Sequence, residues 1–556
     1  MHGFYVRRIT AGVLAAIMMV CTGCDVSFPS QSDSSDDGSG YTFTIDLTSN
    51  PESLDPQSAT DAASITVIRN LYEGLVEKDE NGEIQLAAAA SYTVSDDGLT
   101  YTFQLNNDRY WYYDEDGDDD IDEGETWQVT ADDYVFAFQR IFNSETQSPY
   151  VEMFSCLKNA EAIADGTMEY TSIGVTAISE LQVQFTLEYP NVRFLSLLTT
   201  TAAMPCNEEF FEDTKGRYGL DEESVASCGA FYLRLWFYDE YGNDNLIYMR
   251  RNSANTSARS VYPSNITFQI QDSLDDAEED YANEETDLLI TSIYPSEYMD
   301  DENYTVTSSR ATTLGLIFNT ESDVYSNLNI RKALSMGIDR SLLGENSSGD
   351  LTAAYGIIPP AVSWNGVSYR ETIPETETTY DPDAAVAVLQ TGLDELNISS
   401  LDSTKILVCA EIMDCENLHD IIQTWQEIFG FYIGIEEVTE TEYWERIESQ
   451  DYTIAVYSIT GEQNDPASVL EEFASDANDF SYENETVDAQ LSALQTCETD
   501  TELLQQCSTI EQMILDDYWF IPIFYKNQYC VSTSDNADLG YDPFTESLFL
   551  RDAKHY

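Results

Sequence analysis

An α/β protein with more than one lobe is predicted by the length of the chain, its composition and its alternation of strand and helix patterns. A chain of 556 residues is too long to fold around a single small hydrophobic core, and a hydrophobic share of 42% is enough to build large cores. Strand and helix patterns alternate along the chain without a repeat period, which favours a mixed fold. A globally disordered chain is excluded, although the charge is high.

The spacing of apolar residues places the individual elements. A helix is predicted over 130–142, because Thr130 and Asp133 form a capping box and apolar residues then recur at helical spacing. A second amphipathic helix is predicted over 417–430, where Gly430 ends the pattern. Strands are predicted at 100–105, 181–187, 405–410 and 431–438. The last two strands flank the second helix and predict a βαβ unit.

The charge of the chain excludes one class of partner. There are 24 Lys and Arg residues against 102 Asp and Glu residues, a formal net charge of -78. Nucleic acids and anionic lipid headgroups are bound through basic patches, so nucleic acid is not an expected partner. The composition favours an exported protein that its acidic surface keeps soluble.

The N-terminus predicts export and anchoring. A short basic region, MHGFYVRR, precedes the apolar run ITAGVLAAIMMV, which is too short to span a membrane. The run ends in CTGC and resembles the lipobox of bacterial lipoproteins. The resemblance implies a signal peptide at 1–23, lipidation of Cys24 and attachment to the cell membrane on its extracellular or periplasmic side. A tether rich in Ser, Asp and Gly follows at 24–41.

Besides Cys21 and Cys24 the chain has eight cysteines, and an exported chain tolerates disulfides. The even number is compatible with pairing, and two local pairs are the first candidates: Cys206 with Cys228, and Cys497 with Cys507. Buried free thiols are the alternative, because the sequence does not fix the connectivity.

The stretch YYDEDGDDDIDEGETW allows two interpretations. One is a calcium loop of the form D-x-D-x-D-G-x-I-x-x-x-E, and the other is a solvated acidic insertion. Residues that fit the calcium template are Asp114, Asp116, Asp118, Ile121 and Glu125. Asp119 stands where the template has Gly, and the flanking segments are not helical. No other cofactor is expected.

Several motifs occur together in a characteristic order. They are SLDPQSATDAASITVIRNLYEGLVEKDENGEI, VSDDGLTYTFQL, VTADDYVFAFQRI with SPY close behind, LGLIFNT and NIRKALSMGIDR. In this order they resemble the peptide-binding family of ABC-importer solute-binding proteins, extracellular solute-binding family 5. The resemblance runs from about residue 42 to the last residue.

The resemblance implies a two-lobed periplasmic-binding-protein-like fold of the class II type, with a hinge and an extra domain on the first lobe. The chain is expected to enter the second lobe near Asp287–Ser292. The implied boundaries are 42–285 for the first lobe, about 78–200 for its extra domain, 286–490 for the second lobe and 491–556 for the return to the first lobe.

One segment, YSITGEQNDPASV, resembles a ligand contact of the family. Peptide-binding relatives have a Trp, then an Asp three residues later that binds the α-ammonium of the peptide, then a Pro four residues further on. Ile459, Glu462 and Pro466 stand at these positions. Glu462 is therefore the first candidate ligand residue, and a solvated acid is its alternative. Asp465 is the second candidate, with a turn-shaping role as alternative, and Tyr457 is the third.

An enzyme is not expected. The sequence has no G-x-S-x-G, H-E-x-x-H or P-loop motif, and its three histidines lie at positions 2, 419 and 555. This distribution argues against histidine-based catalysis or a metal site built from several histidines.

The expected function is capture of oligopeptides or dipeptides and their delivery to the permease and ATPase subunits of an ABC importer. A monomer held at the membrane by its lipid is expected. The alternatives are another solute, such as an oligosaccharide or a small molecule, on the same scaffold, and a surface peptide sensor without transport.

Overall fold

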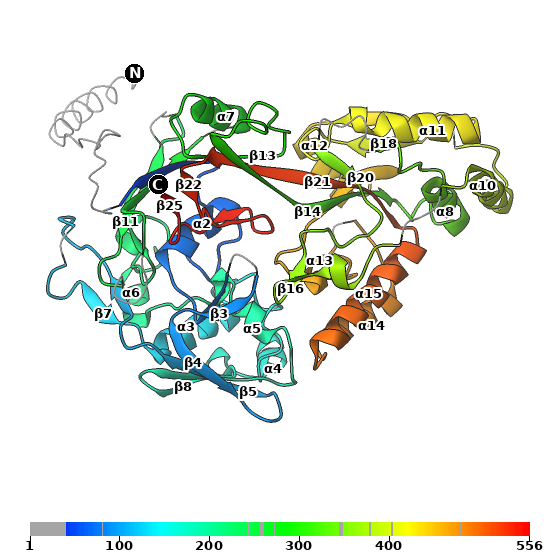
Figure 1. Ribbon diagram of the computed structural model, residues 1–556. Coiled ribbons are helices and arrows are strands. Elements are labelled where there is room, and N and C mark those ends of the chain that lie inside the picture. The colour runs from blue at the N-terminus through cyan, green and yellow to red at the C-terminus, as the bar shows by residue number, and fades with distance from the viewer. Residues whose placement is uncertain are drawn as a thin grey trace, which may run out of the picture.

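Two lobes joined by long strands make up the chain in the computed structural model (Figure 1). The connecting strands β14 (Tyr304–Phe318) and β21 (Phe520–Thr533) are antiparallel neighbours and run from one lobe into the other. The structure describes residues 40–79, 82–119, 121–241, 245–255, 261–271, 273–343, 349–376, 380–401, 404–478 and 480–556. The signal peptide at 1–23, Cys24 and nearly all of the tether lie outside these residues.

The first lobe is built on a four-stranded sheet in the order β1-β12-β11-β10. β1 and β12 are parallel although more than 200 residues separate them, and the other pairs are antiparallel. Every second residue of β1 is buried, as the alternating sequence TFTIDL requires. The elements of this lobe are β1 (Thr42–Leu47), α2 (Ala62–Leu71), β10 (Phe231–Phe237), β11 (Leu246–Arg251), β12 (Asn265–Ile270) and α7 (Leu274–Ala282).

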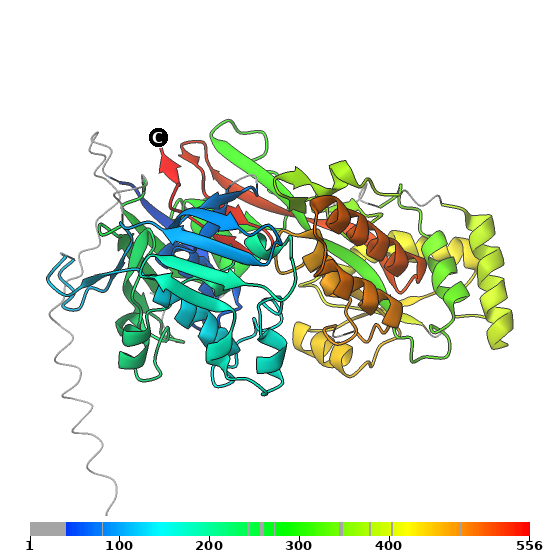
Figure 2. The same ribbon diagram turned by 90° about the horizontal axis from the view of Figure 1, so that it is seen from below.

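The extra domain of the first lobe has a second sheet, in the order β4-β5-β9-β8. Figure 2, seen from below, shows this sheet in blue to cyan. The predicted helix is confirmed as α3 (Ala131–Phe142), with the Thr130–Asp133 capping box, and it packs against β8 and β9. The elements here are β4 (Ala89–Val94), β5 (Thr100–Leu105), β8 (Val175–Ser179), β9 (Gln182–Thr186), α4 (Ala160–Ala164), α5 (Phe194–Leu197) and α6 (Glu208–Asp213).

The second lobe is built on a seven-stranded sheet in the order β13-β21-β14-β20-β18-β19, with β15 added on β21. The predicted βαβ unit is confirmed, because β18 and β19 are parallel neighbours joined by α11. The strands and helices added here are β13 (Leu288–Thr291), α8 (Leu328–Met336), β15 (Leu351–Ala353), α9 (Tyr369–Thr372), α10 (Pro382–Leu396), β18 (Lys405–Val408), α11 (His419–Phe429), β19 (Gly434–Glu437), α12 (Glu440–Glu448), β20 (Ile454–Ile459), α13 (Pro466–Glu471), α14 (Glu485–Leu494) and α15 (Asp500–Asp516).

Both faces of this sheet are covered by helices. Alternate residues of β20 point to opposite faces, so Ala455 joins one core and Ile454 the other. Helices α8, α10 and α11 pack on the Ile454 side, and α12 to α15 pack on the Ala455 side. The expected lobe boundary at residue 491 falls inside the core on the Ala455 side, where Leu503 and Ile510 of α15 are fully buried. The chain therefore returns to the first lobe later, along β21.

The last residues complete the first lobe. Asn70 of α2 donates its side-chain N–H to the carbonyl oxygen of Leu548 at 3.0 Å and accepts from the N–H of Leu550 at 2.9 Å. Small two-stranded ribbons decorate both lobes: β2 (Val76–Lys78) with β3 (Ile84–Leu86), β6 (Tyr110–Tyr112) with β7 (Thr126–Gln128), β16 (Ser363–Trp364) with β17 (Val367–Ser368), β22 (Asn536–Ala537) with β25 (Lys554–His555), and β23 (Tyr541–Asp542) with β24 (Ser547–Leu548).

The eight cysteines of the described residues are all free thiols, and most are buried. The two expected pairs, Cys206 with Cys228 and Cys497 with Cys507, therefore do not form, and the alternative of buried thiols applies. Cys206 instead accepts a hydrogen bond from the guanidinium of Arg140 at 3.5 Å. Across the described ranges, no helix combines the length and the apolar composition needed to cross a membrane.

Candidate functional site

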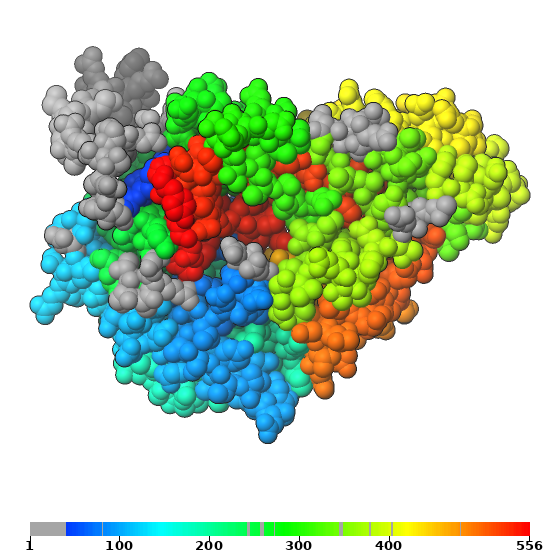
Figure 3. All heavy atoms as spheres, viewed as in Figure 1, coloured from blue at the N-terminus to red at the C-terminus, as the bar shows by residue number. Residues whose placement is uncertain are grey.

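A cavity of about 740 Å³ lies between the two lobes. Its first-lobe walls come from the end of β1, the start of α2, the start of α7 and the segment around β24. Its second-lobe walls include Ser458 and Thr460 at the end of β20, with Glu411 and Glu440, and the hinge strands β14 and β21 complete it. Figure 3 shows the two lobes on either side of the line where they meet. Because both lobes contribute walls, a solute in this cavity would contact both of them.

The C-terminal end of strand β20 reaches this cavity. β14 pairs with β20 along its whole length, whereas β18 pairs only with Ile454 and Ala455. Among the described residues, no strand continues the pairing with β20 on the β18 side beyond Ala455. A strand edge that ends at a cavity is the geometry that accepts an extended ligand by strand addition.

Glu462, the first predicted ligand residue, lies in the loop that follows β20. Its side chain is exposed, and its backbone N–H donates to Ser468 Oγ at 2.9 Å. Surrounding protein nevertheless raises the pKa of Glu462, and Glu471 raises it further. Its charge also raises the pKa of Tyr150, a residue of the first lobe, so the two groups interact electrostatically between the lobes.

A second carboxylate that sequence reasoning did not identify lies beside Glu462. Glu472 accepts hydrogen bonds from the backbone N–H groups of Thr460, at 3.2 Å, and Gly461. Burial raises its pKa to about 7; the two N–H donors lower it, and Glu462 raises it again. Glu472 therefore fixes the loop that carries Glu462 and places two carboxylates at the end of β20.

Asp465, the second predicted ligand residue, is fully buried. It caps the N-terminus of α13 by accepting from the backbone N–H of Ala467 at 2.9 Å, which is the turn-shaping role set out as its alternative. It also accepts from Arg193 Nε of the first lobe at 2.6 Å, and the same guanidinium contacts Glu471 Oε1 at 2.5 Å. Asp465 is thus part of an interlobe ion pair.

Tyr457, the third predicted residue, lies in the core of the second lobe. It is 8% exposed and makes edge-on ring contacts with Trp444 and Phe480. Ile459, at the position where the resembled family has a Trp, is fully buried in the same core. Neither side chain lines the interlobe cavity.

Further contacts hold the lobes together on the Asp465 side. Lys78 Nζ of the first lobe donates to the carbonyl oxygen of Asn464 at 3.1 Å. The Tyr189 hydroxyl donates to Gln495 Oε1 at 2.8 Å. With the Arg193 pair, these contacts define a closed arrangement in which the cavity is covered by both lobes.

The acidic stretch forms the loop of the β6–β7 hairpin, far from β20 (Figure 1). Carboxylate oxygens of Asp114, Asp116 and Asp118 lie within 4.8 Å of one another. Asp119, at the template's Gly position, has a left-handed φ of 68° and is paired with Arg234 and Arg250 of the first-lobe sheet. The loop is therefore anchored by ion pairs. Residue 120 of the template lies outside the described residues.

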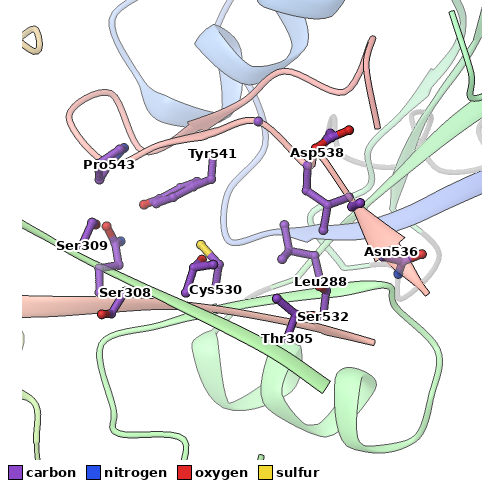
Figure 4. A pocket seen from close by; sticks show the side chains of 15 residues that line it. Leu288, Thr305, Ser308, Ser309, Cys530, Ser532, Asn536, Asp538, Tyr541 and Pro543 are labelled. Carbon is purple, nitrogen blue, oxygen red and sulfur yellow. The ribbon is translucent and has the colours of Figure 1, made fainter. Parts of the chain in front are cut away.

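A smaller cavity of about 270 Å³ lies on the hinge. Figure 4 shows Ser308 and Ser309 of β14 and Cys530 of β21 on one wall, and Tyr541 and Pro543 on the other. The sulfur of Cys530 points toward Tyr541. Leu288, Gln528 and Tyr541 line both cavities, so the hinge cavity adjoins the interlobe one.

Comparison with known proteins assigns this fold and cavity to a family. A model of the bacterial extracellular solute-binding proteins, family 5 (middle region), matches residues 83–481. The chain belongs to this family of extracellular solute-binding proteins, and the predicted membership is confirmed.

Individual relatives are distant but cover nearly the whole chain. The oligopeptide-binding protein OppA of Bacillus subtilis is 25% identical over 536 residues, which are 92% of each chain. The probable deoxycholate-binding periplasmic protein YgiS of Escherichia coli is 24% identical and covers 86% of each chain. The solved structure titled "Structure and mode of peptide binding of pheromone receptor PrgZ" covers 93% of this chain and 100% of its own, at 24% identity and a TM-score of 0.73. This likeness confirms the predicted two-lobed α/β fold.

Proposed function

We propose that this protein is the substrate-binding lipoprotein of an ABC importer and that it captures peptides between its lobes. The observation that carries the proposal is the interlobe cavity, which is lined by the end of β20 beyond the point where β18 pairs with it. The oligopeptide-binding relative, at 25% identity over nearly the full length, supports peptides as the ligand class. The relatives are binding proteins, in agreement with a role that involves no catalysis.

In this proposal, the peptide lies extended along β20. Its backbone pairs with the strand edge beyond Ala455, and its side chains enter the cavity. Its α-ammonium meets Glu462, because a charge-assisted hydrogen bond to a carboxylate is stronger than a neutral one. Glu472 holds the Thr460–Gly461 backbone in place for this contact.

Capture requires the lobes to move. β14 and β21 are continuous between the lobes, so a change in their twist can open the cavity while the chain stays intact. Arg193 of the first lobe and Asp465 of the second are in contact, so opening the lobes would separate them. The closed form then docks on the permease and ATPase subunits as a monomer, with the lipid on Cys24 keeping the protein at the outer side of the membrane.

A second ligand class has one observation in its favour. The relative YgiS is named as a probable deoxycholate-binding protein, and Ile459 removes the aromatic surface that the resembled peptide binders have. A small apolar solute, or an oligosaccharide, is the alternative on the same scaffold. A sensor that binds peptides without transporting them is the third candidate function.

Calorimetry with a panel of ligands tests the proposal. Free-amino peptides of two to six residues, an oligosaccharide series and deoxycholate are titrated separately into the purified protein. Binding of the peptides alone is the expected result. Saturable binding of deoxycholate or of an oligosaccharide, with no heat from any peptide, would replace the proposed ligand class.

A further inference from the structure

The hinge cavity of about 270 Å³ has a floor of small polar side chains. Three pairs of lining residues lie directly opposite one another on β14 and β21: Thr305 with Ser532, Thr307 with Cys530, and Ser309 with Gln528. Along each strand these residues are two positions apart, so all six side chains share one face of the sheet. A sheet face that is covered by protein is normally built from large apolar residues, whereas small polar ones leave room above them. The sequence of the two strands therefore creates the cavity.

The roof of the hinge cavity is the chain segment 536–543, which covers this face without filling the space (Figure 4). Tyr541 lies in the roof, across the cavity from Ser309 and Cys530 of the floor. Leu288, Gln528 and Tyr541 also line the interlobe cavity. The hinge cavity is therefore placed to receive a group that belongs to a ligand in the interlobe cavity.

Two hydroxyl groups at the hinge cavity have no hydrogen-bond partner within the described residues. They are the Ser309 hydroxyl of the floor and the Tyr541 hydroxyl of the roof, and both oxygens are buried. A buried hydroxyl without a partner costs free energy, because it has given up its hydrogen bonds to water. A polar group that enters the cavity meets one of these hydroxyls on each wall.

The lining of the hinge cavity is nearly neutral, although the chain has a formal net charge of -78. Among the described residues that line it, Asp538 alone carries a charge. Lys554 Nζ pairs with Asp538 Oδ2 at 2.7 Å and neutralises it. The polar groups that remain are hydroxyls and amides, which suit an uncharged partner.

Two charged residues, Arg310 and Glu546, lie near the hinge cavity without lining it. Burial raises the pKa of Tyr529 and the charge of Arg310 partly reverses this effect, while alternation along β21 turns Tyr529 away from the cavity floor. Glu546 lines the interlobe cavity, and its charge adds to burial in raising the pKa of Tyr541. A charged group in the hinge cavity would thus lose its hydration without finding an unpaired counter-charge in the lining.

We infer that the hinge cavity is a side pocket of the peptide site and takes one Gln or Asn side chain of the captured peptide. The inference rests on the proposed function, since it names a side chain that the same site selects. A carboxamide both donates and accepts hydrogen bonds, so it can serve the Ser309 and Tyr541 hydroxyls. An apolar side chain of similar size leaves both hydroxyls without a partner.

The test moves one residue, which is Gln, Leu, Lys or Glu, through the four positions of an alanine tetrapeptide with a free N-terminus. Calorimetry at neutral pH is expected to give, at one position, a Kd about tenfold lower for the Gln peptide than for the other three, as one or two hydrogen bonds allow. At the remaining positions the Gln and Leu peptides should bind alike.

Variants that remove the hydroxyls assign this preference to the pocket. Tyr541→Phe and Ser309→Ala each remove one hydroxyl and keep most of the cavity shape. Each should reduce the ratio of the Leu to the Gln Kd at the selective position to about threefold, and the double variant should abolish it. Tyr241→Phe, at a first-lobe tyrosine that is 88% exposed, is the matched control and should keep the wild-type ratio.

The melting temperature of the ligand-free protein gives a second readout. Because the Tyr541 hydroxyl has no partner within the described residues, Tyr541→Phe should not lower the melting temperature. A lower melting temperature together with an unchanged Kd ratio would show that the hydroxyl has a structural role, and it would overturn the inference.

The remaining outcomes separate the inference from the proposed function. Equal Kd values for the Gln and Leu peptides at all four positions would overturn the inference and leave peptide capture standing, with the pocket holding ordered water only. Tightest binding of the Lys peptide would also overturn it, because Glu546 would then govern the choice of side chain. Failure of every peptide to bind the wild-type protein would instead reject the proposed function.

Discussion

Arg193 of the first lobe and Asp465 of the second form a buried ion pair, with Nε and Oδ2 2.6 Å apart. The two residues are 272 positions apart in the chain, and their side chains are 6% and 0% exposed. Since Asp465 caps the start of α13 in the loop after β20, the pair couples lobe closure to the position of the candidate ligand carboxylates.

Removing the charge of Arg193 is expected to weaken ligand binding. In Arg193→Met, closure would bury Asp465 without its first-lobe counter-charge, and breaking a buried pair costs roughly 3–5 kcal/mol. Calorimetry should therefore show a Kd raised by about 100-fold or more for a peptide that the wild-type protein binds. Small-angle scattering should show a lower share of closed molecules.

The double variant Arg193→Met with Asp465→Asn is the control. Asn retains the capping function at the start of α13 and removes the isolated charge, so part of the affinity should return. A single variant that binds as tightly as wild type would show that the pair does not stabilise the closed form.

Replacing Glu462 tests recognition of the peptide N-terminus. Glu462→Ala is expected to weaken binding of free-amino peptides by about 10- to 100-fold, the range of a hydrogen bond to a charged group. N-acetylated versions of the same peptides should bind both proteins equally. Glu448→Ala, at an exposed glutamate of α12 in the second lobe, serves as control. Equal losses for free and acetylated peptides in calorimetry would reject the anchor.

Glu472 is expected to make stability depend on pH near neutrality. Burial raises its pKa from 4.5 to about 7. Between these two pH values the folded protein binds a proton that the unfolded chain releases. The stabilisation of the folded state by this bound proton is therefore complete below pH 4.5 and is lost as the pH rises through about 7. Glu472→Gln can still accept both N–H bonds and carries no charge.

The variant should therefore melt at the same temperature as wild type at about pH 5, and at a higher temperature than wild type at about pH 8. Thermal unfolding followed by circular dichroism at both pH values measures the difference. A variant less stable than wild type at the higher pH would show that the Glu472 carboxylate is favourable when charged.

Calcium distinguishes the two interpretations of the acidic loop. Because the oxygens of Asp114, Asp116 and Asp118 lie within 4.8 Å of one another, a divalent ion would relieve their repulsion. We expect millimolar Ca²⁺ to raise the melting temperature of the wild-type protein. Asp114→Ala with Asp116→Ala should abolish the rise, whereas Glu483→Ala with Glu485→Ala, at exposed acids of the second lobe, should retain it. If Ca²⁺ does not change the melting temperature of the wild-type protein, the acidic stretch is a solvated insertion and not a calcium loop.

The state of the cysteines has a direct chemical test. In denaturant and without reductant, a protein lacking residues 1–39 should react with eight equivalents of a maleimide, as measured by intact mass, because all eight thiols are free. In the native state, only the partly exposed Cys415 and Cys530 should react, and Cys530 should react slowly, because burial raises the pKa of its thiol to about 12. Fewer than eight adducts in denaturant would show that a disulfide forms.

Local patterns were sufficient to predict several of the elements. The capping box of α3 and the alternation of β5 and β9 are properties of adjacent residues, and the structure has all three elements near the predicted bounds. The end of α11 at Gly430 was also predictable, because its φ of 77° is a conformation that glycine favours.

The site was less accessible to sequence reasoning. Arg193 is linked to Asp465 only by the closure of the lobes, which no local pattern encodes. Glu472 is one of 102 acidic residues, and only its hydrogen bonds to Thr460 and Gly461 distinguish it. Tyr457 belongs to the same motif as Glu462, but alternation along β20 turns its side chain into the core.

The central claim, capture of peptides between the lobes, is tested most directly by native mass spectrometry of the protein as purified from cells. Gentle ionisation keeps a ligand in a closed cavity, and its mass is read when it is released. We expect a ladder of peptide masses that disappears after unfolding and refolding. A single non-peptide mass in the cavity would contradict it.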